Sequence, residues 1–249
     1  MRILSLIGLS LLLLTSSVQA APLRFSLVRT GESLDGGEYV WRDGGFAEPA
    51  RITHVAVLIE HRGSRLLFGT GLGRQLDRQV DSLLPWRAKR YRGVTPVRDQ
   101  LERDGLAIDR IVLGCARWTH ASGLADFPGL PVLASAEGMA YAREGAAPAV
   151  LAPQFVPPPD WQPLAFESIA RAGFAESLDL FGDGQVVLVK LPGHGALGLL
   201  LTLDGGHRYF LRGDSDVGEA VAPASVEGAD TLADLQRQGR LAFYPYRYR

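Results

Sequence analysis

The feature that most constrains the fold is an order of short apolar runs and amphipathic stretches that occurs twice, with three consecutive prolines between the two occurrences. In the first half, apolar runs bounded by glycine-containing turns predict strands, and amphipathic stretches predict helices. The predicted strands are 23–28, 52–59, 65–68, 108–113 and 131–134, and the predicted helices are 74–83, 97–103 and 136–143. Pro157, Pro158 and Pro159 then remove three backbone donors, which forbids a helix or a central strand there.

The second half starts again with strands and ends with a helix. Its predicted strands are 177–180, 186–191, 197–203 and 209–211, and its predicted helix is 231–238. Two strand-rich halves can bury their sheets against each other and carry their helices outside. The sequence therefore predicts an α/β (α+β) fold, a four-layer αββα sandwich. Residues 21–249 would form a single domain whose halves join near 153–160.

The N-terminal residues 1–20 have the composition of a cleavable signal peptide. Met1-Arg2 precedes an apolar run, and Val18-Gln19-Ala20 is a small-residue cleavage pattern. The apolar run is too short to span a membrane, and no later segment is apolar enough to do so. We expect a periplasmic or secreted protein with no membrane span.

Charge and composition narrow the classes of partner. With 26 basic and 27 acidic residues, the chain offers no general attraction to nucleic acid. The basic, aromatic-rich segments 86–92 and 244–249 are interpreted as a solvated loop and chain end, although a protein partner bound through the second segment stays open. The single cysteine, Cys115, excludes an internal disulfide.

Residues 113–124, with the sequence LGCARWTHASGL, follow a predicted strand and end in a Gly-Leu turn. This segment resembles the HxHxDH metal-binding loop of the metallo-β-lactamase superfamily, which includes lactonases. Four further segments match the family in the same order, at 53–57, 67–71, 191–195 and 210–214. The resemblance covers most of the chain after residue 20 and implies the same αββα sandwich.

The resemblance also implies which metal ligands are kept. Cys115, Arg117 and Thr119 occupy the positions of two histidines and an aspartate, and only His120 is retained in this loop. By the resemblance, His194 corresponds to a ligand of the first metal that is retained, and Asp214 corresponds to the aspartate that bridges the two metals. No histidine follows position 207, so another family ligand is missing, and Gly69 replaces a further conserved aspartate of the family.

Arg117 argues against the dinuclear site because a guanidinium cannot lose its proton in a protein and donates no lone pair to a metal. We hypothesise that its charge replaces that of the metal and pairs with Asp214. The sequence then predicts a non-catalytic or strongly impaired member of the family, with no cofactor and a small-molecule ligand in the former active-site cleft.

Two alternatives use the residues that remain. Cys115, His120, His194 and Asp214 could ligate one Zn²⁺, which would support hydrolysis of esters, lactones or amides. Without a metal, Cys115 could act as a nucleophile with His120 or His194 as its base, whereas its simpler interpretation is a buried strand-end residue.

The other candidate side chains are assigned structural roles. His54 lies in an alternating strand and is predicted to be a hydrogen-bonded core or face residue. His61 and His207 lie in predicted turns and are expected to be exposed. Trp118 is interpreted as loop packing, with the wall of a pocket as the alternative.

Overall fold

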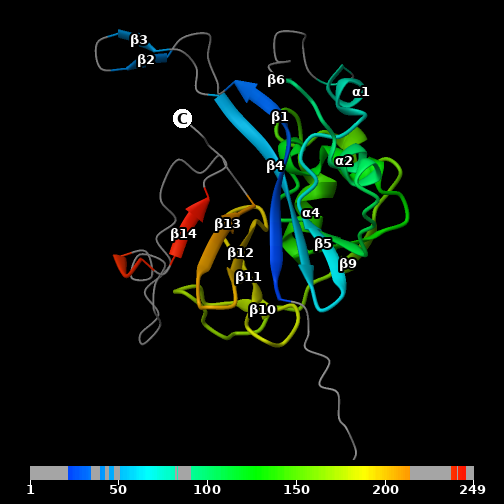
Figure 1. Ribbon diagram of the computed structural model, residues 1–249. Coiled ribbons are helices and arrows are strands. Elements are labelled where there is room, and N and C mark those ends of the chain that lie inside the picture. Colours follow the sequence, from blue (N-terminus) through cyan, green and yellow to red (C-terminus); the bar gives the residue numbers. More distant parts are fainter. Residues whose placement is uncertain are drawn as a thin grey trace, which may run out of the picture.

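The computed structural model describes residues 22–34, 40–42, 45–47, 51–81, 83, 91–213, 237–239 and 241–244. Two sheets face each other, and helices cover the outer face of the first sheet (Figure 1). The predicted signal peptide, 1–20, lies outside the described residues, as does most of the predicted helix 231–238.

The first sheet contains seven strands in the order β6-β1-β4-β5-β7-β8-β9. Their bounds are β1 (Arg24–Leu34), β4 (Arg51–His61), β5 (Ser64–Phe68), β6 (Tyr91–Arg92), β7 (Arg110–Val112), β8 (Pro131–Ala134) and β9 (Asp160–Pro163). Strands β1, β4 and β5 are antiparallel, while β5, β7, β8 and β9 run parallel. The carboxyl ends of β5 and β7 therefore meet at one edge of this sheet.

The second sheet has five strands in chain order, β10 (Ser177–Asp179), β11 (Val186–Lys190), β12 (Leu197–Thr202), β13 (Arg208–Arg212) and β14 (Leu241–Tyr244). The first four are joined as antiparallel neighbours, and β14 pairs in parallel with β13. Strands β2 (Val40–Arg42) and β3 (Gly45–Ala47) form a separate two-stranded sheet.

The helices lie on the side of the first sheet that faces away from the second, on the right in Figure 1. They are α1 (Leu76–Asp81), α2 (Val97–Arg103), α3 (Trp118–Ala121) and α4 (Ala136–Glu144), with the 3-10 helices η2 (Ser122–Asp126) and η3 (Ala152–Phe155). Helix α4 begins after Ser135, whose hydroxyl accepts a hydrogen bond from Gly138 N–H. This cap satisfies one of the free donors in the first turn.

The main core lies between the two sheets. Alternate residues of β4 and β5, including Val57, Ile59 and Phe68, face Leu188 and Leu199 of the second sheet. The residues between them, such as Ala56 and Leu58, face the helices and form the second core. Because both faces of β4 and β5 are covered, these strands are apolar on both sides.

The mixed α/β fold and the two facing sheets confirm the predicted fold class, and helix α2 has the predicted bounds. Three layers are visible in the described part of the chain, and residues 214–236, which precede the last strand, lie outside it. Strand β9 follows the three prolines yet pairs in the first sheet, so the chain passes to the second sheet after Pro163. No helix in the described ranges is long and apolar enough to cross a membrane.

Candidate functional site

The base of the candidate site is a backbone contact between the two sheets. Leu197 N–H, at the start of β12, donates to the carbonyl of Gly114, and Gly213 N–H donates to the carbonyl of Leu197, both at 2.8 Å. A Cβ added to Gly213 would lie 2.4 Å from the Gly114 oxygen, so no side chain fits at that position without a shift. Gly114, after β7, and Gly213, after β13, therefore lie against each other where the two sheets meet.

The 115–121 segment is held by neighbours on two sides. Arg117 occupies the N-cap position of helix α3, which begins at Trp118. The backbone N–H of Thr70, just after β5, donates to the carbonyl of His120 at 2.8 Å, and the Thr70 hydroxyl donates to the same oxygen at 3.0 Å. On the other side, the buried amide of Gln154 donates to the carbonyl of Ala116 at 2.6 Å. The segment is thus a fixed part of the fold.

Within this segment, Cys115 and Arg117 lie in different environments. Cys115 is 3% exposed, lies within the core and forms no disulfide. Arg117 is partly exposed, but its Nε atom is withdrawn from solvent. Arg212, the residue before Gly213, also has buried guanidinium nitrogens, Nε and Nη2. Both arginines therefore bring positive charge to the junction between the two sheets, with part of each guanidinium withdrawn from solvent.

His120 has an unexpected neighbour in His54, which lies on β4. His54 is 4% exposed, and its Nε2 is 2.7 Å from the hydroxyl of Ser33 on β1. Burial, with a smaller contribution from the charge of His120, lowers the pKa of His54 to about 3. His54 is therefore neutral at physiological pH. It was predicted as a hydrogen-bonded core residue, which the structure confirms, but its proximity to His120 has no signal in the sequence.

His194 lies in the loop that precedes β12 and is exposed. Its φ of 48° is in the left-handed region, and its ring stacks on Tyr141 of α4 with centroids 4.3 Å apart. Gly195 fixes the loop to the start of α4, since its carbonyl accepts a hydrogen bond from the Ser135 hydroxyl at 2.9 Å.

The described candidates do not form a metal-binding group. Among the residues that the structure describes, no three His, Cys, Asp or Glu side chains are arranged to hold a metal ion. Cys115, His120 and His194 are all described, whereas Asp214 lies outside the described residues. The four-residue zinc site and the Arg117–Asp214 ion pair therefore stay predictions.

For the remaining histidines and Trp118, the predicted exposure or packing agrees with the structure in some cases and not in others. His207 is exposed, as predicted. His61 was expected to be exposed, which is wrong, because it is 4% exposed and its Nε2 lies 2.6 Å from a carboxylate oxygen of Asp183. Trp118 is partly buried, and its ring contacts those of His54 and Tyr91, with centroids 6.0 Å and 6.1 Å away. These contacts agree with loop packing.

Comparisons with known proteins find solved structures with a similar fold. Neither a protein-family model nor a curated protein matches the sequence. Among solved structures, an N-acyl homoserine lactone hydrolase with N-hexanoyl-L-homoserine bound at its catalytic metal centre is similar with a TM-score of 0.62 and 13% identity, over 91% of this chain and 93% of that one. A variant of AiiA from B. thuringiensis, with N-decanoyl-L-homoserine at its active site, has a TM-score of 0.61 and 14% identity, with 91% and 93% covered.

A third structure, a quorum-quenching N-acyl homoserine lactone lactonase, has a TM-score of 0.59 and 14% identity, with 91% of this chain and 92% of that chain covered. At such low identity the likeness concerns the fold. It extends over nearly the whole chain and includes both sheets. This protein therefore has the metallo-β-lactamase fold, as the order of its sequence motifs predicts.

Proposed function

We propose that this protein binds a small molecule at the edge where the two sheets meet, and that it does so without the dinuclear metal chemistry of the fold. The observation that carries the proposal is the buried Nε of Arg117, in a segment fixed by Thr70 and Gln154. A permanent positive charge at this position opposes binding of a divalent cation. The same charge favours a ligand with a carboxylate or carbonyl oxygen.

The residues near Arg117 support a binding role over catalysis. Cys115 is buried in the core, so its thiol has no access to a substrate in this conformation. His54 is neutral and already hydrogen-bonded to Ser33. His194 lies on the ring of Tyr141. Neither Cys115 nor the buried Ser33–His54 pair is therefore open to a substrate in this conformation.

The alternative is a hydrolase that uses one zinc ion held by Cys115, His120, His194 and Asp214. The similarity to lactonases, one of which has its product bound at a metal centre, favours this alternative. A zinc ion with an open position would supply a water of lowered pKa for attack on an ester, lactone or amide.

Metal analysis of protein purified without chelator separates the two functions. We expect a zinc content well below one ion per chain and no hydrolysis of acyl homoserine lactones above background. The hydrolase alternative would instead be supported by about one zinc ion per chain and by lactone hydrolysis. That hydrolysis should be abolished by a chelator and reduced by Cys115→Ser, and this result would overturn the binding proposal.

A pair of substitutions tests the role of Arg117 directly. Arg117→His removes the fixed charge and restores a residue that can ligate a metal, so we expect zinc affinity to rise. Arg143→His, at an exposed position on α4, is the matched control for one added histidine. Equal zinc binding by both variants would show that Arg117 does not exclude metal from the site.

A further inference from the structure

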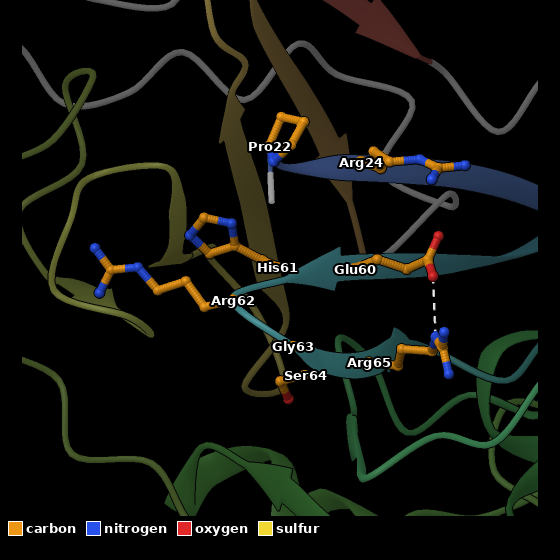
Figure 2. A pocket seen from close by; sticks show the side chains of 8 residues that line it. All are labelled: Pro22, Arg24, Glu60, His61, Arg62, Gly63, Ser64 and Arg65. Carbon is orange, nitrogen blue, oxygen red and sulfur yellow. Dashed lines mark hydrogen bonds and ion pairs between the residues drawn. The ribbon is translucent and has the colours of Figure 1, made fainter. Parts of the chain in front are cut away.

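A pocket of about 210 Å³ surrounds the turn between β4 and β5 (Figure 2). A carboxylate, Glu60, lies among its arginines and accepts a hydrogen bond from Nε of Arg65 at 2.9 Å, the dashed line in Figure 2. Arg62, which also lines the pocket, has its Nε 3.0 Å from a carboxylate oxygen of Asp183. Two of the three arginines that line it are thus paired within the protein, so this pocket indicates no particular ligand.

A smaller pocket, of about 70 Å³, lies on the face of the second sheet that points away from the first. Val187 of β11 and Leu200 of β12 pair in register and belong to the apolar cluster on that outer face. Thr202 follows Leu200 by two positions in its strand, so its side chain points the same way. Arg208, at the start of β13, pairs in register with Thr202 and shares this face. The pocket is therefore at the end of β12 and the start of β13, whereas the candidate site is at the opposite ends of these strands.

Two arginines, Arg171 and Arg208, line this pocket, and no carboxylate is among the described residues that do so. Arg171 lies in the chain before β10, where its backbone pairs with that of Phe174, a member of the same outer apolar cluster. Neither guanidinium has a hydrogen bond or ion pair with any residue that the structure describes. Like charges around one small space repel each other, so an anion between the two arginines would stabilise both.

The apolar residues of the pocket indicate a second property of its ligand. Val187 and Leu200 are 4% and 9% exposed and form the floor, while Arg171 is exposed and lies at the rim. Such a floor is stabilised by contact with hydrocarbon rather than with water. A guanidinium at the rim can donate two parallel hydrogen bonds to the two oxygens of a carboxylate. A space of about 70 Å³ holds only a few non-hydrogen atoms, so the hydrocarbon part must be short.

We propose that this pocket binds a short aliphatic carboxylate, of which butyrate is the probe used below. Its alkyl chain lies on Val187 and Leu200, and its carboxylate accepts hydrogen bonds from Arg171 and Arg208. The hydroxyl of Thr202, beside Arg208, is a further donor in the lining. None of the residues that line this pocket belongs to the candidate site, so the proposal does not depend on the function proposed above.

NMR titration of the purified protein with butyrate, butyramide and sulfate at neutral pH tests the proposal. Butyramide has the shape of butyrate without its charge, and sulfate has charge without an alkyl chain. We expect saturable shifts of the Gly184 and Thr202 amide signals with butyrate, and affinities for both analogues that are lower by about tenfold or more. Absence of saturable shifts, or equal affinity for either analogue, would overturn the proposal. Butyrate shifts confined to residues 115–120 would also overturn it, because the carboxylate would then lie at the candidate site.

Two variants and one control assign the contacts. Arg171→Gln and Arg208→Gln should each weaken butyrate by about tenfold and leave the affinity for butyramide unchanged, because each removes a charged donor and keeps a polar side chain. Arg143→Gln, exposed on α4 and absent from the pocket lining, should change neither affinity. Should Arg208→Gln fail to fold, the titration of the unmodified protein and of Arg171→Gln, at an exposed position, decides the question. Undiminished butyrate binding in Arg171→Gln would contradict the proposed site.

Discussion

The neutral, buried His54 predicts that the stability of this protein decreases on acidification. Its pKa is about 3 in the folded protein against 6.5 for an ordinary histidine. Below pH 6.5 the unfolded chain binds a proton that the folded chain does not bind until near pH 3. The contribution of neutral His54 to the free energy of unfolding is therefore complete above pH 6.5, and it declines as the pH falls from 6.5 toward 3. Linkage gives a loss of about 1 kcal/mol at pH 6 and about 2 kcal/mol at pH 5, relative to pH 8.

Urea unfolding at pH 8, 6 and 5 measures this loss, with His54→Gln as the comparison. Glutamine does not titrate, and its amide can still hydrogen-bond to Ser33, so the variant should lose about 2 kcal/mol less between pH 8 and pH 5 than the unmodified protein. His207→Gln, at an exposed position, controls for the loss of one histidine. If the unmodified protein and His54→Gln lose equal free energy over this range, the reasoning from burial is refuted.

Three further predictions concern the neighbours of the candidate site. In Gly195→Ala the new Cβ would lie 2.0 Å from Gly138 N. Gly193 also has a positive φ, but a Cβ there would have no atom within 4 Å, so Gly193→Ala is the control. We expect Gly195→Ala to lower the free energy of unfolding in urea by about 1–3 kcal/mol more than Gly193→Ala does. The thiol of Cys115 should react with iodoacetamide at neutral pH far more slowly in the native than in the urea-unfolded protein, and equal rates would disprove its burial. Gln154→Leu leaves a loop carbonyl without its donor and should cost about 1–3 kcal/mol in urea unfolding; an unchanged midpoint would contradict this.

Most of the regular fold could be predicted because its strands and helices bury regular apolar faces. Helix α2 and strands β8, β11 and β12 lie within or close to the predicted ranges for this reason. Strand β9 was missed because it is the last strand of its sheet, and most of its side chains are exposed. Helix α3, with four residues, is too short for a periodic pattern to appear.

The site could be predicted only in part. The order of the motifs predicted a cleft near residues 115–120, 194 and 214. The structure places Gly114 against Gly213, whereas Asp214 lies outside the described residues. The pairs His54–His120 and His61–Asp183 were missed. Each pair joins residues that are more than 60 positions apart in the sequence, and nothing in the local pattern of either member indicates its partner.

The hydrogen bonds through Leu197 have a consequence for how the protein folds and how ligands affect it. They connect residues 83 and 16 positions apart, and the first of them connects one sheet to the other. The base of the candidate site is therefore incomplete until both sheets have formed and docked. A molecule bound there would recognise only the docked state, so it should raise the free energy of global unfolding by the full amount given by its concentration and affinity. Ligand screening by thermal shift is thus well suited to this protein, because partial unfolding that separates the sheets also destroys the binding site.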